Sequence, residues 1–191
     1  MYRIVLIITL AFSLSLLIVG QAHGQRYLPE QKGVQFTAGT VDGFNPDKSF
    51  SFGLALSSYN HSGNRWVIGA DYMQKQYGYD SKDIPLAQFI AEGGYYKQMQ
   101  SDPSKTVFFS VGASLAAGYE TINWGKKRLD DGATVTNKDN FLYGGAIAVE
   151  IETFLNDRLA LLVNARERVL FGSEISKFHT QVAVGVKVII N

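Results

Sequence analysis

Long segments of alternating hydrophobicity repeat along most of the chain, and this pattern limits the fold more than any single motif does. The last segment, residues 178–191, reads FHTQVAVGVKVIIN. One of its faces is almost wholly apolar, whereas the other carries His179, Gln181 and Lys187. A period of two residues is that of a β-strand. The segment therefore predicts a strand whose two faces meet very different surroundings.

About eight such segments follow one another, with turn residues between them. They are GVQFTAGTVDG, SFSFGLALSSY, RWVIGADYMQKQYGY, IPLAQFIAEGGYYKQM, TVFFSVGASLAAGYETIN, NFLYGGAIAVEIETF, LALLVNARERVLF and FHTQVAVGVKVII. Many exceed the five or six residues that are usual in globular sheets. Ten or more alternating residues suit strands that cross a bilayer at a tilt. We therefore expect an all-β fold of about eight strands.

The connections between these segments alternate in length. NHSGN, SDPSK and LNDR follow the second, fourth and sixth segments, whereas DGFNPDK, GYDSKD, WGKKRLDDGATVTNKDN and GSEISK follow the odd-numbered ones. Barrels of the bacterial outer membrane have an even number of antiparallel strands, short periplasmic turns and longer outer loops. The sequence therefore predicts an antiparallel up-and-down β-barrel of the outer-membrane type, with the 124–140 loop outside the cell.

The number of charged residues helps to decide whether the apolar face of the barrel lies outside or inside. In a membrane barrel the apolar face meets lipid, and the inner face can hold acids and bases that neutralise one another. We expect the interior polar residues to be Glu120, Glu150, Glu152, Arg166, Arg168, His179, Gln181 and Lys187. A soluble, lipocalin-like periplasmic barrel would reverse the faces, and alternation does not separate the two. Charged residues make up only 18% of the chain, which favours the membrane barrel because soluble exteriors carry more charge.

The first 24 residues have the features of a secretory signal peptide. A short basic start precedes a long apolar run, and Ala22 and Gly24 supply small residues before the expected cleavage site. The apolar run is near the short end of what spans a bilayer, so a retained membrane anchor is the alternative. We expect residues 25–33 to form a short periplasmic lead and residues 34–191 to form a single β-barrel domain.

Charge and cysteine content exclude several classes of protein. Arg3 is the only charged residue in the first 24, so its removal would leave 17 of the 18 basic residues against 17 acidic ones. This balance gives no reason to expect direct binding of nucleic acid. The absence of cysteine excludes a lipid anchor on a cysteine, and also disulfide bonds.

Candidate chemistry is sparse. His179 lies close in sequence to Ser173 and Glu174, and histidine with serine and an acid can form a hydrolase site. Such a site is recognised by its arrangement, which a sequence does not give, so an interior polar contact is the simpler interpretation of His179. With no cysteine and no histidines at ligand spacing, we expect no metal site and no cofactor.

The longest connection carries a cluster of basic residues. Trp124 is followed closely by Lys126, Lys127 and Arg128, which could contact lipopolysaccharide or a partner protein. The alternative is a solvated loop tip. We take these four residues as the candidate partner-contact loop.

Stretches along the whole mature chain resemble one family. They are QRYLP, GNRWVIGADYMQKQYGY, AEGGYY, SDPSKT, AAGYETINWG, NKDNFLYGGA, EIETFLNDR, LLVNARER and KFHTQVAVGVKVIIN. Together they resemble the conjugal transfer protein TraO family of conjugative transposons. The resemblance implies a component of a mating apparatus, of the type IV secretion kind, at the outer membrane of a Gram-negative cell. It implies no catalytic residues.

These observations favour a structural function over an enzymatic one. We expect a non-enzymatic outer-membrane component of a DNA-transfer apparatus, which anchors the complex or presents its outer loops. Its expected partners are outer-membrane lipid and other transfer proteins. The alternatives are an outer-membrane enzyme that modifies lipid and a soluble periplasmic binding barrel with an apolar cavity.

Overall fold

The computed structural model describes residues 30–60, 62–79, 82–125, 139–173 and 176–190. Eight strands run through this part of the chain: β1 (Lys32–Val41), β2 (Ser49–Tyr59), β3 (Arg65–Tyr79), β4 (Lys82–Ser101), β5 (Val107–Ile122), β6 (Asn140–Phe154), β7 (Leu159–Phe171) and β8 (Phe178–Ile189). The expected signal peptide lies outside the described residues. Strand β1 begins two residues before the expected boundary at 34, because Lys32 already pairs with Ser58.

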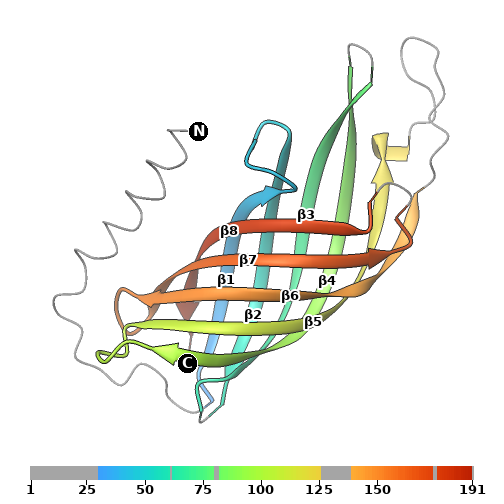
Figure 1. Ribbon diagram of the computed structural model, residues 1–191. Coiled ribbons are helices and arrows are strands. Elements are labelled where there is room, and N and C mark those ends of the chain that lie inside the picture. Colours follow the sequence, from blue (N-terminus) through green and yellow to red (C-terminus); the bar gives the residue numbers. More distant parts are fainter. Residues whose placement is uncertain (1–29, 61, 80–81, 126–138, 174–175, 191) are drawn as a thin grey trace.

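The strands form one closed antiparallel barrel in which each strand pairs with the next and β8 pairs with β1 (Figure 1). Gln35 of β1, for example, lies opposite Ala55 of β2 on one side and Lys187 of β8 on the other. Closure leaves no free sheet edge, so backbone donors and acceptors within the wall meet a neighbouring strand. The predicted up-and-down barrel of eight strands is confirmed.

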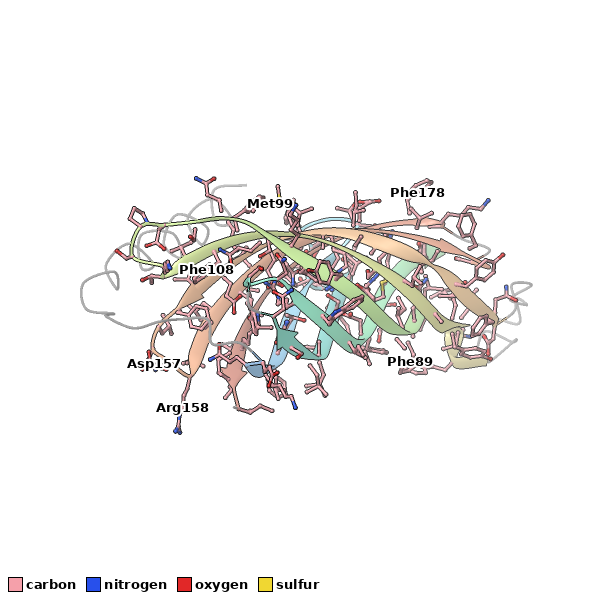
Figure 2. All side chains as sticks on the ribbon, turned by 90° about the horizontal axis from the view of Figure 1, so that it is seen from below. Phe89, Met99, Phe108, Asp157, Arg158 and Phe178 are labelled. Atoms are coloured by element: carbon pink, nitrogen blue, oxygen red, sulfur yellow. The ribbon has the colours of Figure 1, made fainter. Side chains whose placement is uncertain are left out.

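The two faces of the wall differ sharply in polarity. The outer face carries exposed large apolar side chains, among them Leu115, which is 78% exposed, and Ile68, which is 69% exposed. Figure 2 shows Phe89 and Phe178 projecting from the outside of the wall. The inner face carries the buried polar side chains. A lipocalin-like binding barrel needs the opposite arrangement, with an apolar interior.

Strand β8 illustrates this division within one segment. Val184 is 60% exposed on the outer face, whereas His179 and Lys187 are fully buried on the inner face. Because successive side chains of a strand point to opposite faces, the lysine among valines faces the enclosed interior.

Aromatic side chains are concentrated on the outer face in a continuous cross-strand row. Its members, from β2 to β6, lie opposite one another in register: Phe52, Tyr72, Phe89, Tyr119 and Phe141. The rings of Tyr72 and Phe89 are 5.1 Å apart between centroids. Neighbouring aromatic pairs of this kind stabilise a sheet beyond the area that they bury.

The barrel has two different ends (Figure 1). At one end, here the turn end, lie the β2–β3, β4–β5 and β6–β7 connections, residues 60–64, 102–106 and 155–158. At the other, here the loop end, the strands are joined by the β1–β2, β3–β4, β5–β6 and β7–β8 connections, of which residues 42–48, 123–125, 139, 172–173 and 176–177 are described. The expected segregation of the connections between two ends is therefore present.

Each turn-end connection is closed by a side-chain oxygen near its start. Asn60 Oδ1 accepts hydrogen bonds from two backbone N–H groups at 3.0 and 3.1 Å. Asp102 Oδ1 accepts two at 2.6 and 2.7 Å, and Asn156 Oδ1 accepts two at 2.9 Å. Asn and Asp favour turns because their short side chains bond to the backbone a few residues further on.

One connection is shorter than the sequence suggests. GYDSKD, with its glycine and polar residues, predicts a loop after the third strand, but β3 continues to Tyr79 and β4 starts at Lys82. Gly78 still pairs with Asp83 across the hairpin. The turn residues correctly indicate where the chain reverses direction. Gly78, Tyr79, Lys82 and Asp83 nevertheless pair as parts of the two strands.

Apolar side chains fill parts of the interior. The turn end is closed by a buried cluster of Tyr59, Phe108, Phe154, Ala160 and Ile189. A second cluster, nearer the loop end, consists of Ile90, Ala116, Leu142 and Leu170. Charged and polar side chains occupy much of the remaining interior, as is usual for barrels of eight strands, whose interiors are just wide enough for side chains.

Candidate functional site

The charged groups nearest the turn end form a quartet of two acids and two bases, here the turn-end quartet. Lys187 Nζ lies 2.8 Å from Glu152 Oε1 and 3.8 Å from Glu150 Oε1. Arg65 pairs with Glu150 and lies 3.7 Å from Glu152 Oε2. Tyr59 accepts a hydrogen bond from Lys187 at 2.6 Å and donates one to Glu152 at 2.8 Å. All four charged side chains are nearly or fully buried.

A second quartet of two acids and two bases, here the middle quartet, lies further along the interior. Arg168 reaches both acids, with its NH2 nitrogen 2.7 Å from Asp71 Oδ2 and its Nε 3.0 Å from Glu92 Oε2. Arg166 NH1 lies 3.1 Å from Asp71 and 3.2 Å from Glu92. Arg168 also donates a hydrogen bond of 2.8 Å to Gln181.

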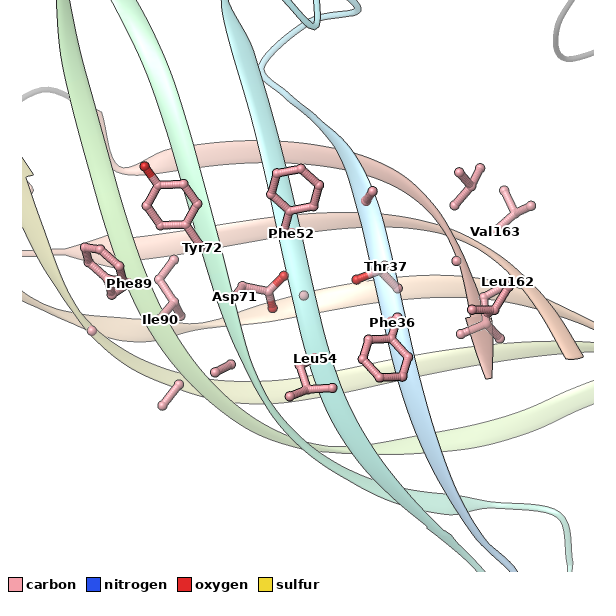
Figure 3. A pocket seen from close by; sticks show the side chains of 18 of the residues that line it. Phe36, Thr37, Phe52, Leu54, Asp71, Tyr72, Phe89, Ile90, Leu162 and Val163 are labelled. Atoms are coloured by element: carbon pink, nitrogen blue, oxygen red, sulfur yellow. The ribbon is translucent and has the colours of Figure 1, made fainter. Parts of the chain in front are cut away.

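The absence of a side chain at Gly53 leaves room for Asp71 of the middle quartet. Thr37, Gly53 and Asp71 lie opposite one another on β1, β2 and β3. A Cβ atom at Gly53 would stand 2.5 Å from Thr37 Oγ1 and 2.8 Å from Asp71 Oδ1. In Figure 3 the hydroxyl of Thr37 and the carboxylate of Asp71 point toward one another across β2. Only glycine leaves space for both groups here.

The depression drawn in Figure 3 is not a single enclosed binding cavity. Its lining includes Phe36 and Phe52, which are exposed on the outer face, as well as Thr37 and Asp71, which point inward. It therefore combines surfaces from both sides of the wall.

The two quartets have the same charge balance. Each places two carboxylates against two cations in the largely buried interior, so each is formally neutral. Taking a charge out of water is costly unless a partner of opposite sign and further hydrogen bonds replace the lost hydration. The quartets meet this condition, and together they cross-link β3, β4, β6, β7 and β8 through the barrel interior.

A third group of polar side chains, here the loop-end cluster, lies at the opposite end of the interior. Asp42, just after β1, accepts a hydrogen bond of 3.0 Å from Lys75 Nζ and lies 3.1 Å from His179 Nδ1. Burial raises the pKa of Asp42, but hydrogen bonds from His179 and Lys75 and attraction to His179 outweigh it and lower this pKa to about 2. Asp42 also accepts a backbone hydrogen bond from Thr180, which ties the β1–β2 connection to β8.

The remainder of the loop-end cluster surrounds Glu120. Gln88 Nε2 donates a hydrogen bond of 2.7 Å to Glu120 Oε2, and Ser173 Oγ donates one of 2.8 Å to the same oxygen. Gln88 Nε2 also lies 3.4 Å from His179 Nε2. Gln88, Glu120 and His179 are fully buried.

The structure places all eight of the residues expected in the interior on the inner face. Seven are buried, and the side chain of Arg166 is 12% exposed. Sequence reasoning missed the partners: Asp42, Arg65, Asp71, Lys75, Gln88 and Glu92 also belong to the three groups. The period of two could have identified Arg65 and Asp71, which share one face of β3. It could not have shown which charges on different strands lie at the same level along the barrel axis, because that depends on the register between strands.

Only part of the candidate partner-contact loop is described. Trp124 is 54% exposed in a short 3₁₀ turn, Asn123–Gly125, with φ of 52°. The turn is held by Asp139, whose Oδ1 accepts a hydrogen bond of 3.1 Å from the Ile122 backbone. Lys126, Lys127 and Arg128 lie outside the described residues.

The geometry around His179 differs from that of a serine hydrolase. Its ring nitrogens face Asp42 and the amide of Gln88, whereas in a triad the second nitrogen faces the serine hydroxyl. The hydroxyl of Ser173 donates to Glu120 instead.

The arrangement as a whole defines a class of protein. An apolar outer face, a closed wall and an ion-paired interior are the features of a transmembrane β-barrel of the outer-membrane type. Among the described residues, no helix is long and apolar enough to cross a membrane, a finding that leaves crossing by strands untouched.

Residues 28–190 match the family described as conjugative transposon protein TraO, and the chain belongs to this family. A search of curated proteins gives no match.

Solved structures of low sequence identity share the fold. The crystal structure of Neisserial surface protein A is 16% identical, with a TM-score of 0.57, and the match covers 83% of this chain and 97% of that one. The crystal structure of the N-terminal β-barrel domain of Pseudomonas aeruginosa OprF is 10% identical, with a TM-score of 0.53 and coverage of 85% and 98%. At these identities the likeness bears on the fold alone.

Proposed function

We propose that the protein is a non-enzymatic structural component of a conjugative DNA-transfer apparatus of the type IV secretion kind. In this proposal it is exported by its signal peptide and inserts in the outer membrane of a Gram-negative cell. There it anchors other transfer proteins or presents its outer loops. The observation that carries the proposal is a closed barrel, apolar outside and ion-paired inside, in a chain of the TraO family.

The outer face supports residence in a membrane. Exposed apolar side chains occur along all eight strands, and a row of aromatic residues crosses five of them. Exposing this apolar surface to water would cost much free energy, whereas contact with acyl chains would not. Aromatic residues are favoured at the boundary between acyl chains and water.

The filled interior supports anchoring or display over transport. The apolar cluster around Phe108 and Phe154 closes the turn end, and two ion-paired quartets cross the space behind it. Eight-stranded barrels are too narrow for an aqueous channel. DNA would therefore pass through another component, and direct binding of nucleic acid is not part of the proposal.

Membrane insertion can be tested with a matched pair of substitutions near the middle of β5. Leu115→Arg places a charge on the outer face, where it costs about 2–4 kcal/mol at the centre of a bilayer. We expect it to reduce the heat-modifiable, folded form in the membrane fraction, whereas Leu115→Met leaves that form unchanged. Recovery of the wild-type protein in the soluble periplasmic fraction would contradict the proposal and favour a periplasmic barrel.

The role of the outer loop can be tested by transfer frequency. Deletion of residues 126–137 removes Lys126, Lys127 and Arg128 and retains the turn around Trp124. We expect transfer to fall while the heat-modifiable form in the membrane stays at its wild-type level. Trp124→Ala tests the described part of the loop separately. Wild-type transfer in the deletion variant would exclude the loop as a partner contact.

The proposal includes no catalysis, and this part is tested through lipids. We expect cells without the protein, and cells with the His179→Ala variant, to have the same lipid A and phospholipid profiles as wild-type cells. A lipid species that disappears in both strains would favour the enzymatic alternative.

A further inference from the structure

The loop-end cluster differs from the two quartets in its charge. Each quartet sets two carboxylates against two cations. At the loop end, Lys75 pairs with Asp42, and none of the described cations forms an ion pair with Glu120. The carboxylate of Glu120 is nevertheless fully buried, and a buried charge without a partner is strongly unfavourable.

One oxygen of this carboxylate and the amide oxygen of its neighbour Gln88 accept no hydrogen bond. They are Glu120 Oε1 and Gln88 Oε1, both on fully buried side chains. The hydrogen bond of 2.7 Å from Gln88 Nε2 to Glu120 Oε2 holds the two groups next to each other. Ser173 donates to Glu120 Oε2 and leaves Oε1 unpartnered. Buried polar atoms are nearly always paired, so two unpaired acceptors on adjacent groups require an explanation.

We propose that Glu120 and Gln88 bind a monovalent metal cation, Na⁺ or K⁺, at the loop end of the barrel interior. A carboxylate and an amide oxygen are ligands for hard cations. A single positive charge would neutralise Glu120, as Lys187 and Arg65 neutralise Glu150 and Glu152. Within the described part of the chain no three His, Asp or Glu residues are placed to hold a metal ion, which disfavours a transition metal.

The size of the ligand follows from the burial of the site. Gln88, Glu120 and His179 are inaccessible to solvent, so the ammonium group of a peptide or lipid could not reach Glu120 without displacing them, and the proposal is confined to a small ion. The bound cation would hold together β4, which carries Gln88, β5, which carries Glu120, and the β7–β8 connection, which carries Ser173. It would thereby stabilise the loop end.

The test compares thermal unfolding of the detergent-purified, folded barrel in NaCl, KCl and choline chloride at equal ionic strength. Choline is too large for the site. We expect the wild-type midpoint to be about 2–4 °C higher in NaCl or KCl than in choline chloride, since a ligand that binds only the folded state raises it. The Glu120→Gln variant should lose this difference and, in choline chloride, should unfold at or above the wild-type midpoint.

Glu152→Gln is the matched control, because it changes a buried glutamate that has cationic partners. We expect it to lower the midpoint in all three salts and to keep the response to Na⁺ or K⁺. If Glu120→Gln does not fold, Gln88→Leu removes one of the two oxygens and should weaken the response. Equal wild-type midpoints in the three salts, or an unchanged response in Glu120→Gln, would overturn the proposal.

Crystals grown in rubidium chloride give a direct readout, since Rb⁺ replaces K⁺ and scatters anomalously. We expect an anomalous peak beside Glu120 Oε1 that is missing in Glu120→Gln crystals. The absence of a peak in crystals of a wild-type protein whose midpoint responds to KCl would overturn this position for the cation.

Discussion

The turn end and the loop end of this barrel are stabilised in different ways. Asn60, Asp102 and Asn156 close the three short connections of the turn end, and behind them lie an apolar cluster and a neutral quartet. At the loop end, three of the four connections are longer than those of the turn end, the β3–β4 connection being the exception, and Glu120 has no cationic partner among the described residues. The comparison indicates that charges are neutralised within the protein at the turn end and in the middle of the barrel, whereas the loop end holds Asp42, with its lowered pKa, and the proposed cation site.

The largest effect is expected where a quartet loses one cation. Arg168→Met removes both ion pairs of Arg168 and leaves Asp71 and Glu92 with Arg166 alone. We expect the free energy of unfolding to fall by about 3–5 kcal/mol, the usual cost of an uncompensated buried charge. Urea unfolding followed by tryptophan fluorescence measures it. Arg158→Met, on the exposed turn between β6 and β7, is the control and should have almost no effect.

A smaller loss is expected when a whole ion pair is removed from the turn-end quartet. The double variant Lys187→Met, Glu152→Met leaves Arg65 paired with Glu150 and keeps the quartet neutral. We expect it to lose about 2 kcal/mol, less than Lys187→Met alone, because apolar groups replace a pair more readily than they replace one partner. If the two single losses simply add in the double variant, the quartet does not act as a unit.

The turn-end connections should contribute more stability than the described part of the β1–β2 connection at the loop end. Asp102→Ala removes the acceptor of two backbone hydrogen bonds, at 2.6 and 2.7 Å, and should cost about 2 kcal/mol. Asn45→Ala, in the β1–β2 connection, removes one bond of 3.2 Å and should cost about 0.5 kcal/mol. Chemical unfolding of both variants under the same conditions makes the comparison. Equal costs would remove the distinction between the two ends.

A small effect is also expected for the pH dependence of stability at the loop end. The pKa of Asp42 is about 2 in the folded protein against 3.8 for an ordinary aspartate. Its contribution is therefore complete above about pH 4 and is lost as the pH falls toward 2. We expect Asp42→Asn to cost about 1 kcal/mol at pH 6, and the difference from wild type to shrink below pH 4. A difference that grows in acid would contradict this assignment.

The sequence predicts the fold far better than it predicts the interior contacts. Alternation in residues 178–191 places His179, Gln181 and Lys187 on one face, and the structure has them there because a strand offers no other arrangement. Alternation does not give the register between strands. It therefore could not show that Lys187 meets Glu152, or that Glu120 meets Gln88 and Ser173 instead of a cation.

A sequence cue also misled in one place. The glycine and polar residues of GYDSKD are typical of a loop, yet Gly78 and Asp83 are paired in the β3–β4 hairpin. Turn residues indicate where a chain can reverse its direction. Backbone hydrogen bonding decides how far the two strands extend toward that turn.

The account depends on the apolar outer face meeting acyl chains, and cysteine labelling tests this most directly. The chain has no cysteine, so single cysteines at Val184 and Val186, on the outer face, can be compared with one at Arg158 on the exposed turn. In intact membranes, a lipid-soluble maleimide should label the two outer positions, and a water-soluble maleimide should label only the turn. Rapid labelling of Val184→Cys by the water-soluble reagent in intact membranes would contradict the account.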